Sequence, residues 1–118
     1  MNLEPYEKEL EKLNACIWDY AELKFQEVRS AGAMEDLLEQ HGFRVTRGLA
    51  HMPTAFVAEY GSGKPVIAIL GEYDALSGLS QEDEVWEEKP REENPNGHGC
   101  GHCLLGTAAV GAGLLLKD

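Results

Sequence analysis

Basic residues, cysteines and long hydrophobic runs are all scarce in this sequence of 118 residues. The chain has only 10 Lys and Arg residues but 21 Asp and Glu residues, so its formal net charge is −11. Such an acidic field repels phosphate, which excludes a nucleic-acid partner and disfavours an anionic membrane surface. No run approaches the ~20 consecutive apolar residues that a membrane span needs. The charged first ten residues also lack the apolar core of a signal peptide, so we expect a cytoplasmic protein.

The cysteine content agrees with that compartment. There are three cysteines, an odd number, and this does not suggest a disulfide framework. With 43% hydrophobic and 26% charged residues, the chain has the composition of a folded globular protein rather than a disordered one. Its length predicts one domain over residues 1–118.

Two amphipathic helices are expected in the N-terminal half. In residues 4–21 apolar side chains recur every three or four positions, which predicts one helical stripe, formed by Leu10, Leu13, Ile17 and Ala21. A second helix is predicted to start near Ser30, which would act as its N-cap, and to stop at Gly42.

The remaining elements predict an α/β fold. Residues 43–46 and 54–60 have the composition of strands, and the nearly all-apolar run 65–70 is typical of a strand buried on both faces of a sheet. The acidic stretch 81–94 is predicted to be a solvated loop. An Ala-, Leu- and Gly-rich helix is expected over residues 104–117.

Two carboxylates follow the apolar run directly. Glu72 and Asp74 come just after the expected strand, at its carboxyl end. In open α/β sheets ligands gather at this edge, so these side chains are candidates for a functional site.

A second cluster combines soft and borderline metal ligands. His98, Cys100, His102 and Cys103 are separated mainly by glycines, which let the backbone fold close to an ion. Imidazole and thiolate suit zinc and related divalent metals. The pattern favours an open, catalytic-type metal site, with a structural metal site or a redox pair as the alternatives. The cluster precedes the last expected helix, whose N-terminal dipole stabilises anions.

Three motifs taken together resemble a known family. Residues 71–76 (GEYDAL), 78–81 (GLSQ) and 96–102 (NGHGCGH) are similar to the amidohydrolase branch of the co-catalytic zinc peptidases. That branch includes aminoacylases, carboxypeptidase G, hippurate hydrolase and the p-aminobenzoyl-glutamate hydrolase B-subunit type. The resemblance extends over nearly the whole chain and implies a partial zinc-peptidase-like α/β catalytic domain: N-terminal helices, strands of a mixed sheet and a C-terminal helix.

The resemblance also implies roles for individual residues. Cys100 and His102 match metal ligands, with Cys100 at the position that can bridge two ions, and Asp74 matches the acidic residue that orients a ligand at the catalytic centre. Glu72 stands where other branches carry a ligand histidine. His98 and Cys103 are uncertain members of the site. The implied cofactor is a divalent metal, zinc first and manganese as the alternative.

The implied reaction is hydrolysis of an amide bond between an acyl or aroyl group and an amino acid, with a small acyl-amino acid or dipeptide-like substrate. Two positions depart from the family pattern: Ser77 replaces a proline, and Cys103 replaces an asparagine or aspartate. Family members are several times longer and supply further ligands and a Glu-Glu pair, so this chain resembles the N-terminal part of such an enzyme. The isolated chain is therefore expected to be inactive.

Two other roles are compatible with this sequence. The chain could be a non-catalytic metal-binding module that keeps part of the site, or an oligomerising remnant of the family. An incomplete sheet and an apolar terminal helix leave hydrophobic surface, so we expect a homo-oligomer or a complementary chain.

Overall fold

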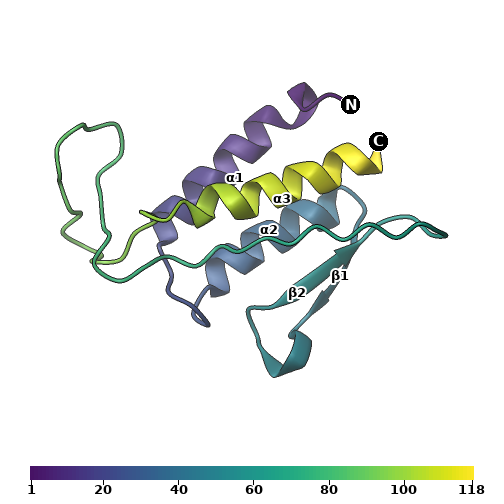
Figure 1. Ribbon diagram of the computed structural model, residues 1–118, viewed down its shortest axis with the longest axis horizontal. Coiled ribbons are helices and arrows are strands. Elements are labelled where there is room, and N and C mark those ends of the chain that lie inside the picture. The colour runs from purple at the N-terminus through teal and green to yellow at the C-terminus, as the bar shows by residue number, and fades with distance from the viewer.

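The computed structural model describes residues 1–118 as three α-helices and one short β-hairpin (Figure 1). The elements in chain order are a 3₁₀ turn η1 (Glu4–Tyr6), α1 (Glu7–Tyr20), α2 (Val28–Gln40), β1 (Arg44–Arg47), a second 3₁₀ turn η2 (Leu49–His51), β2 (Phe56–Glu59) and α3 (His102–Lys117). The predicted mixed α/β class is confirmed. No helix is long and apolar enough to cross a membrane.

The core lies between the three helices. The apolar stripe of α1 faces α2 and α3, and Ile17 and Leu114 are fully buried where α1 meets α3. The buried cluster consists of Tyr6, Leu13, Ile17, Met34, Leu37, Leu38, Cys103, Val110 and Leu114. Helix packing therefore supplies most of the stability, as expected for amphipathic helices of this length.

The hairpin confirms two of the three predicted strands. β1 and β2 pair antiparallel, with Arg44 opposite Glu59 and Arg47 opposite Phe56. Partly buried apolar side chains of both strands pack against the helical core. The sheet has these two strands and no more.

The prediction of a third, buried strand at residues 65–70 is wrong. These residues are extended, but they have no strand partner and all are exposed. They run beside α3 across one face of the molecule (Figure 1). The prediction rested on their apolar composition, which is typical of strands buried on both faces. In this structure no other strand pairs with residues 65–70 and no second layer covers them.

The start of α2 also differs from its prediction. The helix begins at Val28, and Ser30 lies inside it rather than at its N-cap. The capping oxygens come instead from Glu22, whose carboxylate accepts hydrogen bonds from the backbone N–H groups of Arg29 (3.1 Å) and Ser30 (2.8 Å). A carboxylate at this end is favoured by the helix dipole. The predicted stop is confirmed, since Gly42 takes the left-handed conformation (φ +86°) just after the helix.

Candidate metal site

The segment after the apolar run is held in place from two sides. The backbone N–H of Ala75 donates to the carbonyl of Glu22 (2.7 Å) in the turn after α1. Leu76 and Gly97 exchange two backbone hydrogen bonds of 2.9 and 3.0 Å. These bridges fix residues 72–76 beside the start of α3.

Gly97 can make this bridge because it has no side chain. A Cβ at this position would run into the backbone of Leu79 and Ser80. The glycine therefore lets its backbone lie against residues 76–80 next to the site.

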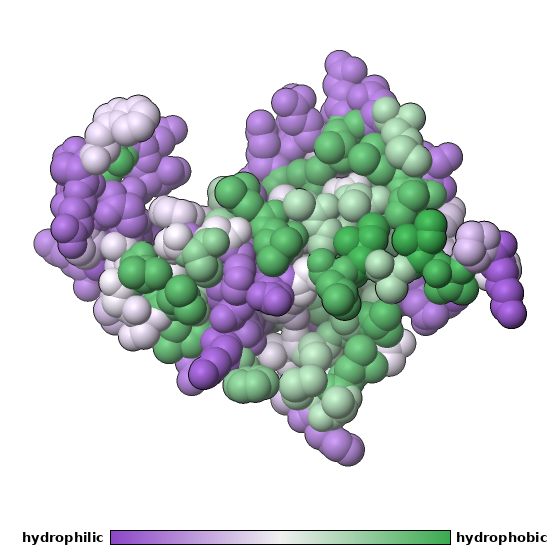
Figure 2. Space-filling view, in the orientation of Figure 1, coloured by the Kyte–Doolittle hydropathy of each residue, from purple (hydrophilic) through white to green (hydrophobic).

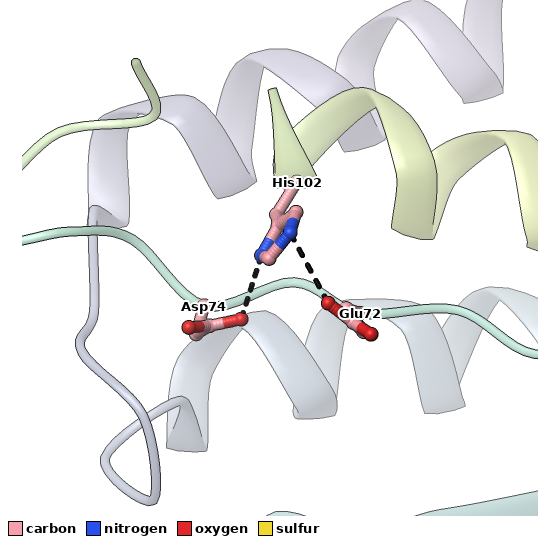
Figure 3. Close-up of side chains that lie close together, drawn as sticks. All are labelled: Glu72, Asp74 and His102. Atoms are coloured by element: carbon pink, nitrogen blue, oxygen red, sulfur yellow. Dashed lines mark hydrogen bonds and ion pairs between the residues drawn. The ribbon is translucent and has the colours of Figure 1, made fainter. Parts of the chain in front are cut away.

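The helix α3 starts within the histidine and cysteine cluster. Its N-cap is Gly101, in the left-handed conformation (φ +85°), and its carbonyl accepts hydrogen bonds from the N–H groups of Leu104 and Leu105. The helix begins at His102, two residues earlier than predicted. This places the imidazole of His102 in the first turn, directed at the segment that carries the carboxylates (Figure 3).

Three side chains meet there. Nδ1 of His102 lies 2.7 Å from Oδ1 of Asp74, and Nε2 lies 3.1 Å from Oε2 of Glu72 (Figure 3). One potential ligand atom from each of the three residues lies within 4.8 Å of the other two. Asp74 and His102 are about three-quarters buried, whereas two-thirds of the Glu72 side chain is exposed.

The donor chemistry of this group fits a divalent cation. A neutral imidazole carries one N–H, so it can donate to only one of the two carboxylates. The other ring nitrogen then presents a lone pair toward a carboxylate, which leaves two acceptors facing each other. An ion between them satisfies both, and imidazole with carboxylate is a ligand set typical of zinc and manganese.

Cys100 lies next to this group without joining it. Its thiol is exposed, and Sγ is 4.0 Å from the backbone carbonyl of Asp74. The distance places the sulfur on the loop over Asp74, outside the cluster of three ligand atoms.

His98 and Cys103 point away from the group. His98 is buried, and its Nε2 lies 3.0 Å from the carbonyl of Ile17 in α1, so this nitrogen carries the proton. Burial lowers the pKa of His98. Cys103 is part of the core cluster, and burial raises the pKa of its thiol. His98 and Cys103 therefore connect the motif to the helical core, His98 through its hydrogen bond to α1 and Cys103 through packing.

Three further polar contacts carry no clear signal in the sequence. Nε2 of His41 lies 2.9 Å from Oε2 of Glu9. Arg47 binds the buried carboxylate of Glu35 (2.6 Å) and that of Glu39 (2.8 Å). These contacts join residues that are separated in the sequence and belong to no common motif. The only sequence signal is the four-residue spacing of Glu35 and Glu39, which places both carboxylates on one face of α2.

Comparison with known proteins gives one curated relative that matches strongly. The chain is 52% identical over 101 residues to the B subunit of p-aminobenzoyl-glutamate hydrolase from Escherichia coli (strain K12). The match covers 86% of this chain. The chain belongs to the family of this hydrolase.

The match covers only 21% of the relative, so the chain spans about a fifth of the length of that protein. No protein-family model matches the chain. The family membership therefore rests on the relative and on the motifs that contribute Glu72, Asp74 and His102.

Proposed function

We propose that this chain forms one part of a metal-dependent amidohydrolase, which cleaves the amide bond between an acyl or aroyl group and an amino acid. The observation that carries the proposal is the meeting of Glu72, Asp74 and His102 between the apolar run and the start of α3. The name of the relative gives the chemistry of the substrate class, since p-aminobenzoyl-glutamate joins an aroyl group to an amino acid through an amide.

We assign Glu72 and His102 as metal ligands, with Nε2 and Oε2 directed at a common point (3.1 Å apart). Zinc is the preferred ion and manganese the alternative. When bound, such an ion polarises the carbonyl of the scissile amide. Cys100 lies close enough to Asp74 for its thiolate to approach the same ion after a small movement of the loop.

Asp74 orients the ligand. Its carboxylate accepts the Nδ1 proton of His102 at 2.7 Å, which fixes the tautomer whose Nε2 is free to bind metal. A carboxylate in this position also raises the basicity of the imidazole. Asp74 therefore acts through His102 and not on the substrate.

The general base and the remaining ligands are proposed to come from further polypeptide. Glu72, Asp74 and His102 are all engaged with one another, and the acidic residues of the loop 81–94 lie mostly exposed to solvent. General-base assistance contributes typically about 10²–10⁴-fold to the rate, so the isolated chain should hydrolyse little. We also propose a cytoplasmic location, in line with three free cysteines.

The test uses a chimera of the Escherichia coli protein in which the 101 matched residues are replaced by those of this chain. With zinc or manganese and its natural partner chain, the chimera should hydrolyse p-aminobenzoyl-glutamate. His102→Ala should abolish turnover, while the matched control His51→Ala, an exposed histidine in η2, should keep it. Equal turnover of the His102→Ala and His51→Ala chimeras would show that the site does not carry the reaction.

A further inference from the structure

The main chain anchors the segment that carries the two carboxylates at one end only. The backbone bridges of this segment, at Ala75 and Leu76, both follow Glu72 and Asp74 in the chain. Residues 65–74 themselves take part in no backbone–backbone hydrogen bond. A contact other than a backbone bridge must therefore hold the stretch on which the carboxylates lie.

The run before the carboxylates gives little support. The side chains of residues 65–70 are exposed, with Val66 at 83% and Leu70 at 89%. Figure 2 shows hydrophobic residues gathered over α3 and this neighbouring run on one face of the molecule. Apolar side chains that stay in contact with water gain little burial energy, so the run does not fix the residues that follow it.

Tyr73 lies between the two carboxylates and points to the other side of the segment. Side chains of successive residues in an extended stretch alternate between its two sides. The carboxylates of Glu72 and Asp74 both reach His102, so the side chain of Tyr73 is directed away from this imidazole. Its ring packs against the helical core and lies 6.2 Å from the ring of Phe56 in β2.

The hydroxyl of Tyr73 links the segment to the hairpin. It donates a hydrogen bond to the backbone carbonyl of Thr54, which lies just before β2. Thr54 is buried (6% exposed), and a buried carbonyl needs a donor. The ring and the hydroxyl together thus attach the backbone to β2 at the point between the two carboxylates.

The helix α3 leaves space for the same stretch of backbone. A Cβ on Gly106 would lie 3.1 Å from the carbonyl oxygen of Glu72 and 3.2 Å from the Cβ of Tyr73. Gly106 is four residues after His102 and therefore on the same helix face. The backbone of Tyr73 accordingly packs close to α3, while its side chain contacts the hairpin.

We propose that Tyr73 is a positioning residue of the candidate site. It holds the backbone between Glu72 and Asp74 and so sets their distances to His102, 3.1 and 2.7 Å. Tyr73 acts through its two neighbours and not on an ion or a substrate. Its effect on metal binding rests on the proposed function, whereas its effect on the pair of Asp74 and His102 does not.

The first test needs no metal. The ring nitrogens of His102 are followed by NMR of the isotope-labelled chain in EDTA and are assigned with His102→Ala. Tyr73→Phe keeps the ring and removes only the hydroxyl. It should change the ring-nitrogen shifts of His102, because the hydrogen bond to Asp74 changes in length.

Tyr6→Phe is the matched control. Tyr6 is also a core tyrosine, and its hydroxyl donates to the carboxylate of Asp118, at the opposite end of α3 from His102. Both variants lose one hydroxyl hydrogen bond and should lower the melting temperature. Only Tyr73→Phe should alter the resonances of His102, whereas a purely structural role of Tyr73 would leave them as they are in the control.

The second test measures cobalt(II) binding by visible absorption, at a temperature where all variants are folded. Tyr73→Phe should weaken the affinity at least about threefold, less than the loss typical of a residue that hydrogen-bonds a ligand directly. Tyr6→Phe should bind cobalt as the wild type does.

Unchanged His102 resonances in the Tyr73→Phe chain would overturn the proposal, and so would a cobalt affinity equal to that of Tyr6→Phe. A wild-type chain that binds no cobalt would instead refute the proposed metal site. The resonances of His102 would still decide the role of Tyr73 in that case.

Discussion

The imidazole of His102 and the carboxylate of Asp74 form a pair 2.7 Å apart, although 28 positions separate them in the sequence. Asp74 comes from an extended segment held by backbone bridges, and His102 from the first turn of a helix. A loop-borne carboxylate and a helix-borne imidazole are thus brought together by main-chain contacts, which positions them before any ion binds.

We predict that the chain binds one zinc ion weakly at this pair and Glu72. Isothermal titration calorimetry should give measurable binding for the wild type, and His102→Ala should reduce the affinity at least about tenfold. Asp74→Asn should have a smaller effect of the same sign, because it removes only the orienting charge. Identical affinities for wild type and His102→Ala, with His51→Ala as the control, would refute the assignment of the ligand.

The thiols should differ in reactivity toward a water-soluble alkylating reagent. Cys100 is exposed and should react first, whereas Cys103 is buried with a raised pKa and should react only after unfolding. Mass spectrometry of the modified peptides distinguishes the two sites. Zinc should slow the modification of Cys100 if its sulfur approaches the ion, and Cys100→Ser provides the control. Faster modification of Cys103 than of Cys100 in the native chain would contradict the burial of the motif.

Replacing Gly97 with alanine should destabilise the chain. The new methyl group would meet the backbone of Leu79 and Ser80, so we expect a loss of about 1–3 kcal/mol in the free energy of unfolding. Gly32→Ala is the matched control, because a Cβ there has open space and alanine favours the α2 helix. Urea unfolding of both variants tests this, and a Gly97→Ala variant as stable as Gly32→Ala would be the contrary result.

The ion pairs of Arg47 should make the free energy of unfolding depend on pH. The hydrogen bond from Arg47 lowers the pKa of Glu39, so this group adds stability above the ordinary Glu pKa of about 4.3. That contribution is lost as the pH falls through the lowered pKa. Arg47→Met should destabilise the chain near pH 7, chiefly because the buried Glu35 carboxylate loses its partner.

Unfolding measured from pH 7 to pH 3 should show the difference in stability between wild type and Arg47→Met shrinking as Glu39 takes up a proton. Arg44→Met, at the other end of the same strand and without an ion pair, should track the wild type. A gap that stays constant across this range would mean that Arg47 acts by packing alone.

The sequence predicted best the features that depend on local pattern. The stripe of Leu13 and Ile17 indicated α1, and the left-handed Gly42 ended α2 as expected. The start of α2 was misplaced because its caps come from Glu22, outside the helix. The run 65–70 was predicted as a buried strand because apolar composition shows a need for burial, not the presence of a partner.

The candidate site was predictable in its residue types but not in its geometry. The sequence motifs identified Asp74, His102 and Glu72 as candidates, and the structure places these three side chains close together. They could not show that His98 and Cys103 face the core, since that depends on where α1 packs. Whether a residue of the motif is a candidate ligand or packs into the core depends on long-range contacts, which the spacing of residues in the sequence does not show.

The free backbone of residues 65–70 has a consequence for limited proteolysis. Proteases bind their substrates as extended strands, and this segment offers that conformation without prior unfolding. A first cut there leaves Glu72, Asp74 and His102 together on the C-terminal piece, while α1 and α2 remain on the other. The buried packing of α1 against α3 would hold the nicked pieces together, so cleavage would show on a denaturing gel before it changed the hydrodynamic size.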